Sequence, residues 1–190
     1  MTDQEPFFRH LTTLLERAGI PFIISGSLAS SFHGDPRATN DFDLVIDPNL
    51  DALNRFVDSL PVDWYASKDA AQTAFKQRSM FNVVNADSGW KADLIIRKDR
   101  PFSLQEFSRG VSGTILGIRV AVVTPEDSIL SKLEWSRESG SERQYHDAIG
   151  VALLNVNTLD RNYLMQWAKE LNVEQLLDRL LRELDTHKSS

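Results

Sequence analysis

Hydrophobic residues follow two different periods along this chain, and the change between them falls near residue 124. Before that point, short runs of apolar and β-branched residues are separated by turn residues, a pattern typical of strands. Polar and apolar residues alternate over 41–46, which predicts a strand with one buried face. Strands are expected at 21–25, 41–46, 79–86 and 92–97, with a hairpin at 111–123.

Apolar residues spaced three and four positions apart predict the helices. In the first part of the chain they indicate helices at 7–18, at 28–32, and after Asp47, which is expected to cap a helix reaching about residue 60. After Thr124-Pro125, a step that suits the first turn of a helix, the pattern is helical throughout. Helices are expected there at 126–138, 142–154, 160–171 and 174–185.

These elements predict an α/β (α+β) fold, with a mixed-sheet domain at 1–123 and a helical C-terminal segment at 124–190. The sequence has no cysteine, which excludes disulfides and cysteine-ligated zinc. Acidic residues precede any apolar run at the N-terminus, unlike a signal peptide, and no apolar run approaches the roughly 18 residues of a membrane span. We therefore expect a cytoplasmic protein without a membrane partner.

The chemically informative pattern is Gly26-Ser27, then residues 28–40, then Asp41-Phe42-Asp43. Alternate side chains of a strand project from the same face, so Asp41 and Asp43 should lie together while Phe42 faces the core. Two crowded carboxylates repel each other, and a divalent cation removes that cost. Magnesium prefers oxygen ligands and often takes one or two carboxylates together with substrate phosphates. The pair therefore predicts a magnesium site, with two ions if a phosphoryl group is transferred.

Gly26-Ser27 ends an apolar strand and leads into a predicted helix. The start of a helix has unpaired N–H groups and favours anions, and glycine allows a phosphate to approach the backbone closely. The Ser27 hydroxyl either caps this helix or donates to a phosphate oxygen. Alone, Gly-Ser is typical of a turn and Asp-x-Asp of a solvated strand. Their order and spacing favour a nucleotide site.

This combination resembles the DNA polymerase β-like nucleotidyltransferase superfamily, whose members carry Gly-Gly/Ser after a strand and Asp-apolar-Asp shortly afterwards. The form Arg-x-Thr-x-Asp-x-Asp, from Arg37 to Asp43, is similar to small bacterial members. The resemblance implies that Asp41 and Asp43 are catalytic and bind the metal. It implies nucleotide contacts by Gly26, Ser27, Arg37 and Thr39.

Members of the superfamily often add a third carboxylate on a neighbouring strand, flanked by apolar residues. Asp93, within Ala92-Asp93-Leu94-Ile95, is the candidate for this third catalytic and metal-binding residue. The alternative is a strand aspartate without a role in the reaction.

A second resemblance lies in the helical segment. The run from Pro125 to Lys132 is similar to the Pro-Glu-Asp-x-x-x-x-Lys helix of AbiEii-type toxins and related small nucleotidyltransferases. In these proteins an Arg-x-x-x-Asp pattern follows, and Arg143 to Asp147 is similar. The resemblance implies that Lys132 and Asp147 belong to the nucleotide site. The alternative for Asp147 is an ion pair with Lys132 or Arg143.

Together these features predict a metal-dependent nucleotidyltransferase, which moves a nucleoside monophosphate from a nucleoside triphosphate (NTP) to an acceptor hydroxyl and releases pyrophosphate. The toxin resemblance implies tRNA as the acceptor and an antitoxin as a protein partner; a protein or a small molecule are the other acceptors. The alternative is a non-catalytic nucleotide-binding or antitoxin-like module with the same fold, which the presence of all three aspartates disfavours.

Charge bears on the choice of acceptor. The net charge of −6 argues against a protein that coats nucleic acid through bulk charge. Residues 60–124, however, contain nine basic and six acidic residues, a net charge of +3. Arg97, Lys98 and Arg100 follow the Asp93 strand directly. The segment either contacts an RNA backbone or reflects ordinary scatter of surface charge.

Overall fold

The computed structural model describes residues 4–34 and 41–188, so the predicted contributions of Arg37 and Thr39 lie outside the described residues. In the first part of the chain the elements are α1 (Gln4–Ala18), β1 (Phe22–Ile24), α2 (Gly26–Phe32), β2 (Asp41–Ile46), α3 (Leu50–Asp58), β3 (Trp64–Tyr65), α4 (Lys68–Gln77), β4 (Met80–Asn85), β5 (Lys91–Ile96), α5 (Pro101–Ser108), β6 (Val111–Ile115) and β7 (Ile118–Val122). The helices that follow are α6 (Pro125–Ser139), α7 (Glu142–Leu154), α8 (Arg161–Leu171) and α9 (Glu174–Lys188).

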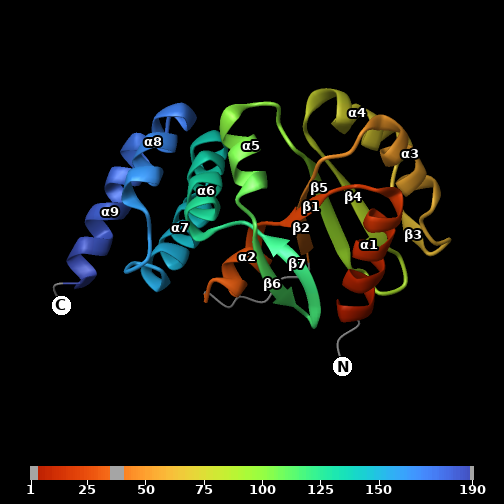
Figure 1. Cartoon of the computed structure of the whole chain (residues 1–190), viewed down its shortest axis with the longest axis horizontal. Helices are drawn as coiled ribbons and strands as arrows, with labels where there is room; N and C mark the ends of the chain where they lie inside the picture. Colours follow the sequence, from red (N-terminus) through yellow and green to blue (C-terminus); the bar gives the residue numbers. More distant parts are fainter. Residues whose placement is uncertain (1–3, 35–40, 189–190) are drawn as a thin grey trace.

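The described strands form one mixed sheet in the order β3-β4-β5-β2-β1-β7-β6 (Figure 1). β2 runs parallel to β5 on one side and antiparallel to β1 on the other. β1 in turn pairs in parallel with β7, while β4–β5 and β6–β7 are antiparallel pairs. This arrangement confirms the predicted α/β class with a mixed sheet, and it places β2 in the interior of the sheet.

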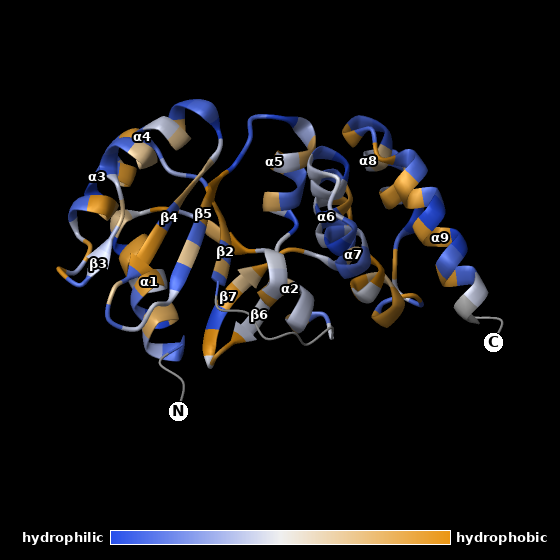
Figure 2. Ribbon diagram, turned by 180° about the vertical axis from the view of Figure 1, so that it is seen from behind, coloured by the Kyte–Doolittle hydropathy of each residue, from blue (hydrophilic) through white to orange (hydrophobic). Residues whose placement is uncertain are grey.

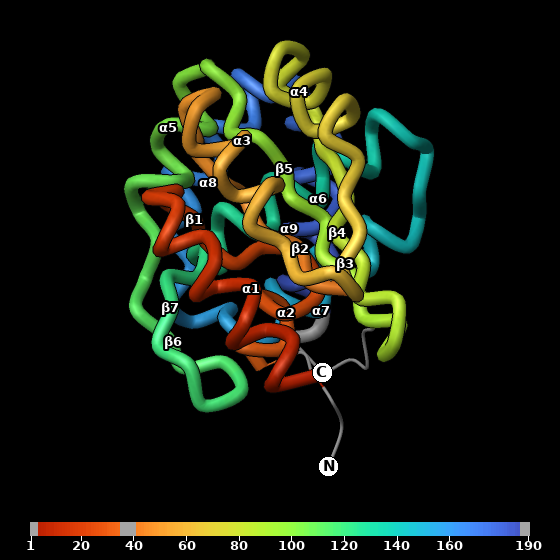
Figure 3. The backbone as a smooth tube through the Cα atoms, turned by 90° about the vertical axis from the view of Figure 1, so that its right-hand side faces the viewer, coloured from red at the N-terminus to blue at the C-terminus, as the bar shows by residue number. Residues whose placement is uncertain are grey.

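Helices α1, α3 and α4 pack on one face of the sheet. Phe42 of β2 is fully buried and stacks on Phe8 of α1, with ring centroids 5.0 Å apart. Small side chains let α4 approach the same core, where Ala71 and Ala74 are buried. Figure 3 shows this side of the molecule, with α1, α3 and α4 in front and the C-terminal helices α8 and α9 behind.

The helices after residue 124 bury a second apolar cluster, made mainly by α6, α7, α8 and α9. Phe102 of α5 also belongs to this cluster, so a residue from before the predicted boundary contributes to the second core. Figure 2 shows these helices beside the sheet, with apolar stretches of ribbon between polar ones. The division at 123–124 stays a prediction. No described helix has the length and apolar character needed to cross a membrane.

The prediction that Asp47 caps the helix after β2 is wrong. Asn49 is the N-terminal cap of α3, and its side-chain oxygen accepts the N–H of Ala52 at 2.8 Å. Asp47 instead forms an ion pair with Arg97, with Nε and Oδ2 3.0 Å apart. The sequence patterns also gave no indication of β3, α4 or α5.

Candidate active site

Strands β2 and β5 bring the three predicted aspartates onto one face of the sheet. Asp43 and Asp93 are register partners on these parallel strands, and Asp41 lies two residues before Asp43, opposite Lys91. Phe42 and Leu44, which alternate with the acids, are fully buried on the other face. We call the face that carries Asp41, Asp43 and Asp93 the acidic face. The register places the three side chains on one face, and their catalytic roles stay predictions.

Burial and neighbouring charges both act on the carboxyl group of Asp43. Burial raises the pKa of its carboxyl above the usual range, and the nearby charges of Asp93 and Asp41 add to this effect. A hydrogen bond from the backbone of Ser27 and the charge of Lys132 lower the pKa, but they do not cancel the increase. The ionised form of Asp43 is therefore held at a cost in free energy.

Gly26 makes this arrangement sterically feasible. Its φ angle is +59°, and a Cβ atom at this position would lie 1.9 Å from Oδ2 of Asp43. Glycine therefore serves two purposes here: it adopts the left-handed backbone conformation and it leaves room for the carboxylate. The predicted pair Gly26-Ser27 does open helix α2, and in this structure the helix start faces Asp43.

Two further polar side chains meet Asp93. The sequence suggested Lys91 only as one of the basic residues that bracket the Asp93 strand and could contact a polyanion, and it did not suggest Asn82. Asn82 of β4 is the register partner of Asp93, and its side-chain amide donates to Oδ1 of Asp93. The Lys91 ammonium lies 3.2 Å from Oδ1 of Asp93 and 3.8 Å from Oδ1 of Asp41. Burial lowers the pKa of Lys91, but the neighbouring carboxylates outweigh this effect and raise it. Alternation along β4 predicts the face on which Asn82 lies, but it does not predict which strand pairs with β4.

The helical segment contributes a cation to the acidic face. Lys132 of α6 is buried, and its ammonium lies 3.5 Å from Oδ2 of Asp147 on α7. Its charge also lowers the pKa of Asp43. The structure therefore brings Lys132 close to the predicted site, and it pairs Asp147 with Lys132, one of the two interpretations that the sequence left open.

Magnesium suits the chemistry of the acidic face. Asp41, Asp43 and Asp93 offer the hard oxygen donors that this ion prefers, and a cation would relieve the cost of ionising Asp43. Among residues 4–34 and 41–188, however, no three His, Cys, Asp or Glu side chains converge closely enough to hold a metal ion. In this structure the Lys91 ammonium bridges Asp41 and Asp93.

The basic residues that follow β5 are largely engaged within the molecule. Arg97 pairs with Asp47 and lies 3.5 Å from Asp99, and its side chain is only 11% exposed. The guanidinium of Arg100 makes two hydrogen bonds to Glu134 of α6, at 2.5 and 2.6 Å. These contacts connect the end of β5 to Asp47 and to α6. They leave less positive charge available to bind a polyanion than the sequence indicated.

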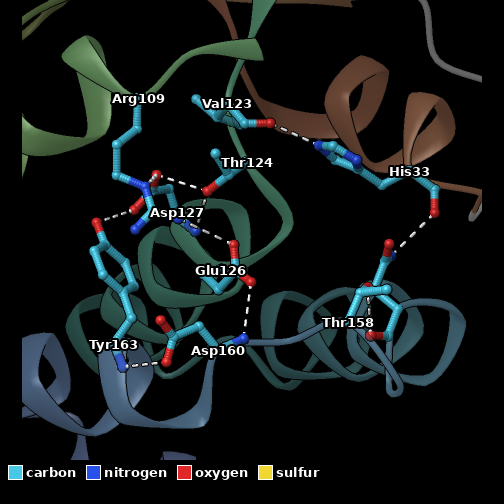
Figure 4. A network of polar contacts seen from close by, with 10 residues as sticks. His33, Arg109, Val123, Thr124, Glu126, Asp127, Thr158, Asp160 and Tyr163 are labelled. Carbon is cyan, nitrogen blue, oxygen red and sulfur yellow. Dashed lines mark hydrogen bonds and ion pairs between the residues drawn. The ribbon is translucent and has the colours of Figure 1, made fainter.

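A buried polar network fixes α6 in place (Figure 4). Asp127 accepts hydrogen bonds from the hydroxyls of Thr124 and Tyr163, at 2.7 and 2.6 Å. Arg109 pairs with Asp127 and with Glu126, and its guanidinium lies 3.7 Å from the centroid of the Tyr163 ring. The Glu126-Asp127 part of the Pro-Glu-Asp pattern thus anchors α6 to the neighbouring α8 and to Arg109.

A second set of contacts ties α2 to the same region. The imidazole of His33 lies with Nε2 2.6 Å from the carbonyl oxygen of Val123, and the Asn155 side-chain amide donates to the His33 carbonyl at 3.1 Å (Figure 4). His33 directly follows α2, Val123 directly follows β7, and Asn155 directly follows α7. These bonds hold the sheet and the helical segment in one arrangement, and so they help to set the position of Lys132.

No known family model matches this chain, and no curated protein sequence matches it. The fold is similar to a solved antigenic nucleotidyltransferase-like protein from Paracoccidioides brasiliensis, with a TM-score of 0.65 and 18% identity over 97% of this chain and 90% of that one.

The fold is also similar to two structures of the antibiotic-resistance factor ANT(2'')-Ia. The solution structure has a TM-score of 0.56 at 15% identity and covers 100% of this chain and 99% of that one. The crystal structure in complex with adenylyl-2''-tobramycin has a TM-score of 0.55 at 14% identity and covers 96% of this chain and 99% of that one. These likenesses show a nucleotidyltransferase-like fold; the narrower resemblance to AbiEii-type toxins stays a prediction.

Proposed function

We propose that this protein is a metal-dependent nucleotidyltransferase, which transfers a nucleoside monophosphate from an NTP to an acceptor hydroxyl and releases pyrophosphate. The observation that carries the proposal is the register pairing of Asp43 with Asp93, with Asp41 on the same face of a nucleotidyltransferase-like fold. One similar structure contains adenylyl-2''-tobramycin, which is a nucleotidylated small molecule.

Asp41 and Asp43 would hold two magnesium ions, and Asp93 would complete the set of ligands. When bound, the ions supply Lewis-acid stabilisation of the charge on the transferring phosphoryl group. For this to happen, Lys91 must give up its contacts with Asp41 and Asp93, and its ammonium becomes available to phosphate oxygens. The raised pKa of Asp43 supports this assignment. Burial raises it most and the charges of Asp93 and Asp41 add to it, and a bound cation would offset this cost of the ionised form.

The protein side chains have separate tasks in this reaction. Asp93, held by Asn82, accepts the proton of the acceptor hydroxyl as the new phosphorus–oxygen bond forms and the bond to pyrophosphate breaks. Lys132 neutralises charge on the departing pyrophosphate, and Asp147 is a positioning residue that holds Lys132. The remaining nucleotide contacts are proposed for Gly26, Ser27, Arg37 and Thr39.

The acceptor is a separate question within the same proposal. tRNA, the acceptor that the toxin resemblance implies, stays a prediction, as does an antitoxin partner. The ion pairs of Arg97 and Arg100 favour a small hydroxylated molecule instead, because these guanidinium groups are already committed to carboxylates. A small acceptor also suits a chain with a net charge of −6, which repels a polyanion overall.

The test is magnesium-dependent release of pyrophosphate from each of the four NTPs, with total tRNA or with a set of aminoglycosides as acceptor. We expect release that needs magnesium and is lost in Asp41→Asn and Asp93→Asn. Asp87→Asn, in the exposed turn between β4 and β5, is the matched control and should retain activity. Lack of magnesium-dependent NTP binding would contradict the proposal. Binding without pyrophosphate release from any acceptor would favour the non-catalytic module instead.

A further inference from the structure

Helix α6 presents a second side chain next to Lys132 that the proposed reaction has not used. Residues three and four apart on a helix share a face, so Trp135 lies beside both Ser131 and Lys132. Ser131 contacts Glu106 of α5, whereas the charge of Lys132 acts on Asp43. Leu133, on the opposite side of α6, is fully buried in the second apolar cluster. Trp135 therefore lies on the exposed side of α6, between Ser131, which faces α5, and Lys132, which acts on the acidic face.

Trp135 is unusually exposed for a tryptophan. Its exposed fraction is 47%, whereas Trp64 is 8% exposed and stacks on Phe7, and Trp167 packs on the second apolar cluster near Phe102. An indole ring has a large apolar surface that gains free energy when it is covered, and stacking on another flat ring covers it well.

We infer that Trp135 is the stacking platform for the base of the incoming NTP, an inference that rests on the proposed function. Lys132 and Trp135 are separated by about 4.5 Å along the helix axis. A helical side chain leans toward the N-terminus of its helix, so the indole covers the turn that carries Lys132. A nucleotide whose triphosphate lies against Lys132 can then extend its base over the Trp135 ring.

Stacking uses the flat face of the base and not its hydrogen-bonding edge, so it does not discriminate strongly among bases. The inference therefore requires Trp135 to contribute to the binding of all four NTPs. It also requires Trp135 to contribute nothing to a ligand that has the phosphates but lacks a base. Inorganic tripolyphosphate is such a ligand, and it separates the role of Trp135 from that of Lys132.

The experiment measures binding of the four NTPs and of tripolyphosphate, each with magnesium, to the wild-type protein and to Trp135→Ala and Trp135→Phe. Loss of one stacked base is expected to weaken NTP binding by about five- to 150-fold in Trp135→Ala. Tripolyphosphate affinity should stay unchanged, and Trp135→Phe should retain most of the NTP affinity because it keeps a ring. Tyr65→Ala, which removes an exposed aromatic side chain from β3 at the sheet edge, is the matched control and should affect neither ligand.

The outcomes separate the inference from the function beneath it. Equal losses for tripolyphosphate and NTPs in Trp135→Ala would overturn the inference, because they would indicate a structural role. Unchanged NTP affinity with a raised KM for the acceptor would also overturn it and would assign Trp135 to the acceptor. A wild-type protein that binds neither NTP nor tripolyphosphate with magnesium would refute the proposed function and this inference together.

Discussion

Gly26→Ala is the most direct test of how the acidic face is built. Alanine in the left-handed conformation costs about 1–2 kcal/mol. In addition, the new Cβ would lie 1.9 Å from Oδ2, 2.4 Å from Cγ and 2.6 Å from Cβ of Asp43. The Asp43 side chain must therefore move and lose the hydrogen bond from the backbone of Ser27, at a further cost of about 1.5–3 kcal/mol for a charged acceptor.

These two contributions predict a loss of about 2.5–5 kcal/mol in the free energy of unfolding. For a chain of this size the melting temperature should fall by roughly 5–20 °C. Gly89→Ala is the matched control, since Gly89 has a φ angle of +75° but no atom within 4 Å of its would-be Cβ. It should show only the backbone cost and lose about 1–2 kcal/mol. The assays are thermal unfolding and magnesium-dependent NTP binding, which Gly26→Ala should lose and Gly89→Ala should keep.

A double-mutant cycle isolates the contact with Asp43, because the three atoms nearest to the new Cβ all belong to Asp43. In an Asp43→Gly background, Gly26→Ala should cost no more than Gly89→Ala. Equal losses of melting temperature in Gly26→Ala and Gly89→Ala, with NTP affinity kept in both, would contradict a steric clash between the new Cβ at position 26 and Asp43.

Three further predictions follow from charged groups of the structure. Asp43→Asn should raise the melting temperature by about 2–4 °C at neutral pH without magnesium, because it removes the cost of ionising a buried carboxyl beside two other aspartates, about 1 kcal/mol. The pKa of Asp43 is raised in the folded state, so this gain should disappear below about pH 4, where the carboxyl is protonated in the folded and the unfolded protein. A loss of stability in Asp43→Asn at neutral pH would contradict this prediction. Glu106→Gln should stabilise the protein by about 3 kcal/mol above pH 7, because burial raises the pKa of Glu106 to about 7. Wild-type stability should accordingly fall between about pH 4 and 7, and equal pH profiles of wild type and variant in thermal unfolding would refute this. Lys132→Met should weaken tripolyphosphate binding at least tenfold and raise the pKa of Asp43 further, whereas Asp147→Asn should weaken binding less. Calorimetry compares the two variants, and equal losses of affinity would contradict a direct contact between Lys132 and the phosphates.

Local patterns predicted the strands that carry the acids, but not how they pair. Alternation over 41–46 fixed the common face of Asp41 and Asp43, and burial of Phe42 agrees with it. The pairing of Asp43 with Asp93 depends on contacts between residues 50 positions apart, which periodicity does not encode. Only the resemblance to a known family suggested Asp93, and no signal in the sequence pointed to Asn82 as its partner.

The missed helices have identifiable physical causes. The buried positions of α4 are Ala71 and Ala74, whose small side chains give a weak apolar stripe. α5 spans eight residues and buries the charged side chain of Glu106, so its pattern lacks a clear polar face. The misplaced cap has a similar origin, because Asp and Asn are both common caps. In the structure Asn49 accepts the N–H of Ala52 while Asp47 pairs with distant Arg97, a contact that the local sequence does not reveal.

The interior position of β2 has a consequence for the timescales of motion at the site. Its backbone is paired with β1 on one side and β5 on the other, whereas β3 and β6 lie at the two edges of the sheet. Amide protons of β2 should therefore exchange with solvent only when the whole sheet opens, while those of β3 and β6 exchange through local opening. The backbone that spaces Asp41 and Asp43 then stays fixed on the timescale of turnover. Any rearrangement during a catalytic cycle must come from side chains or from the helices that face them.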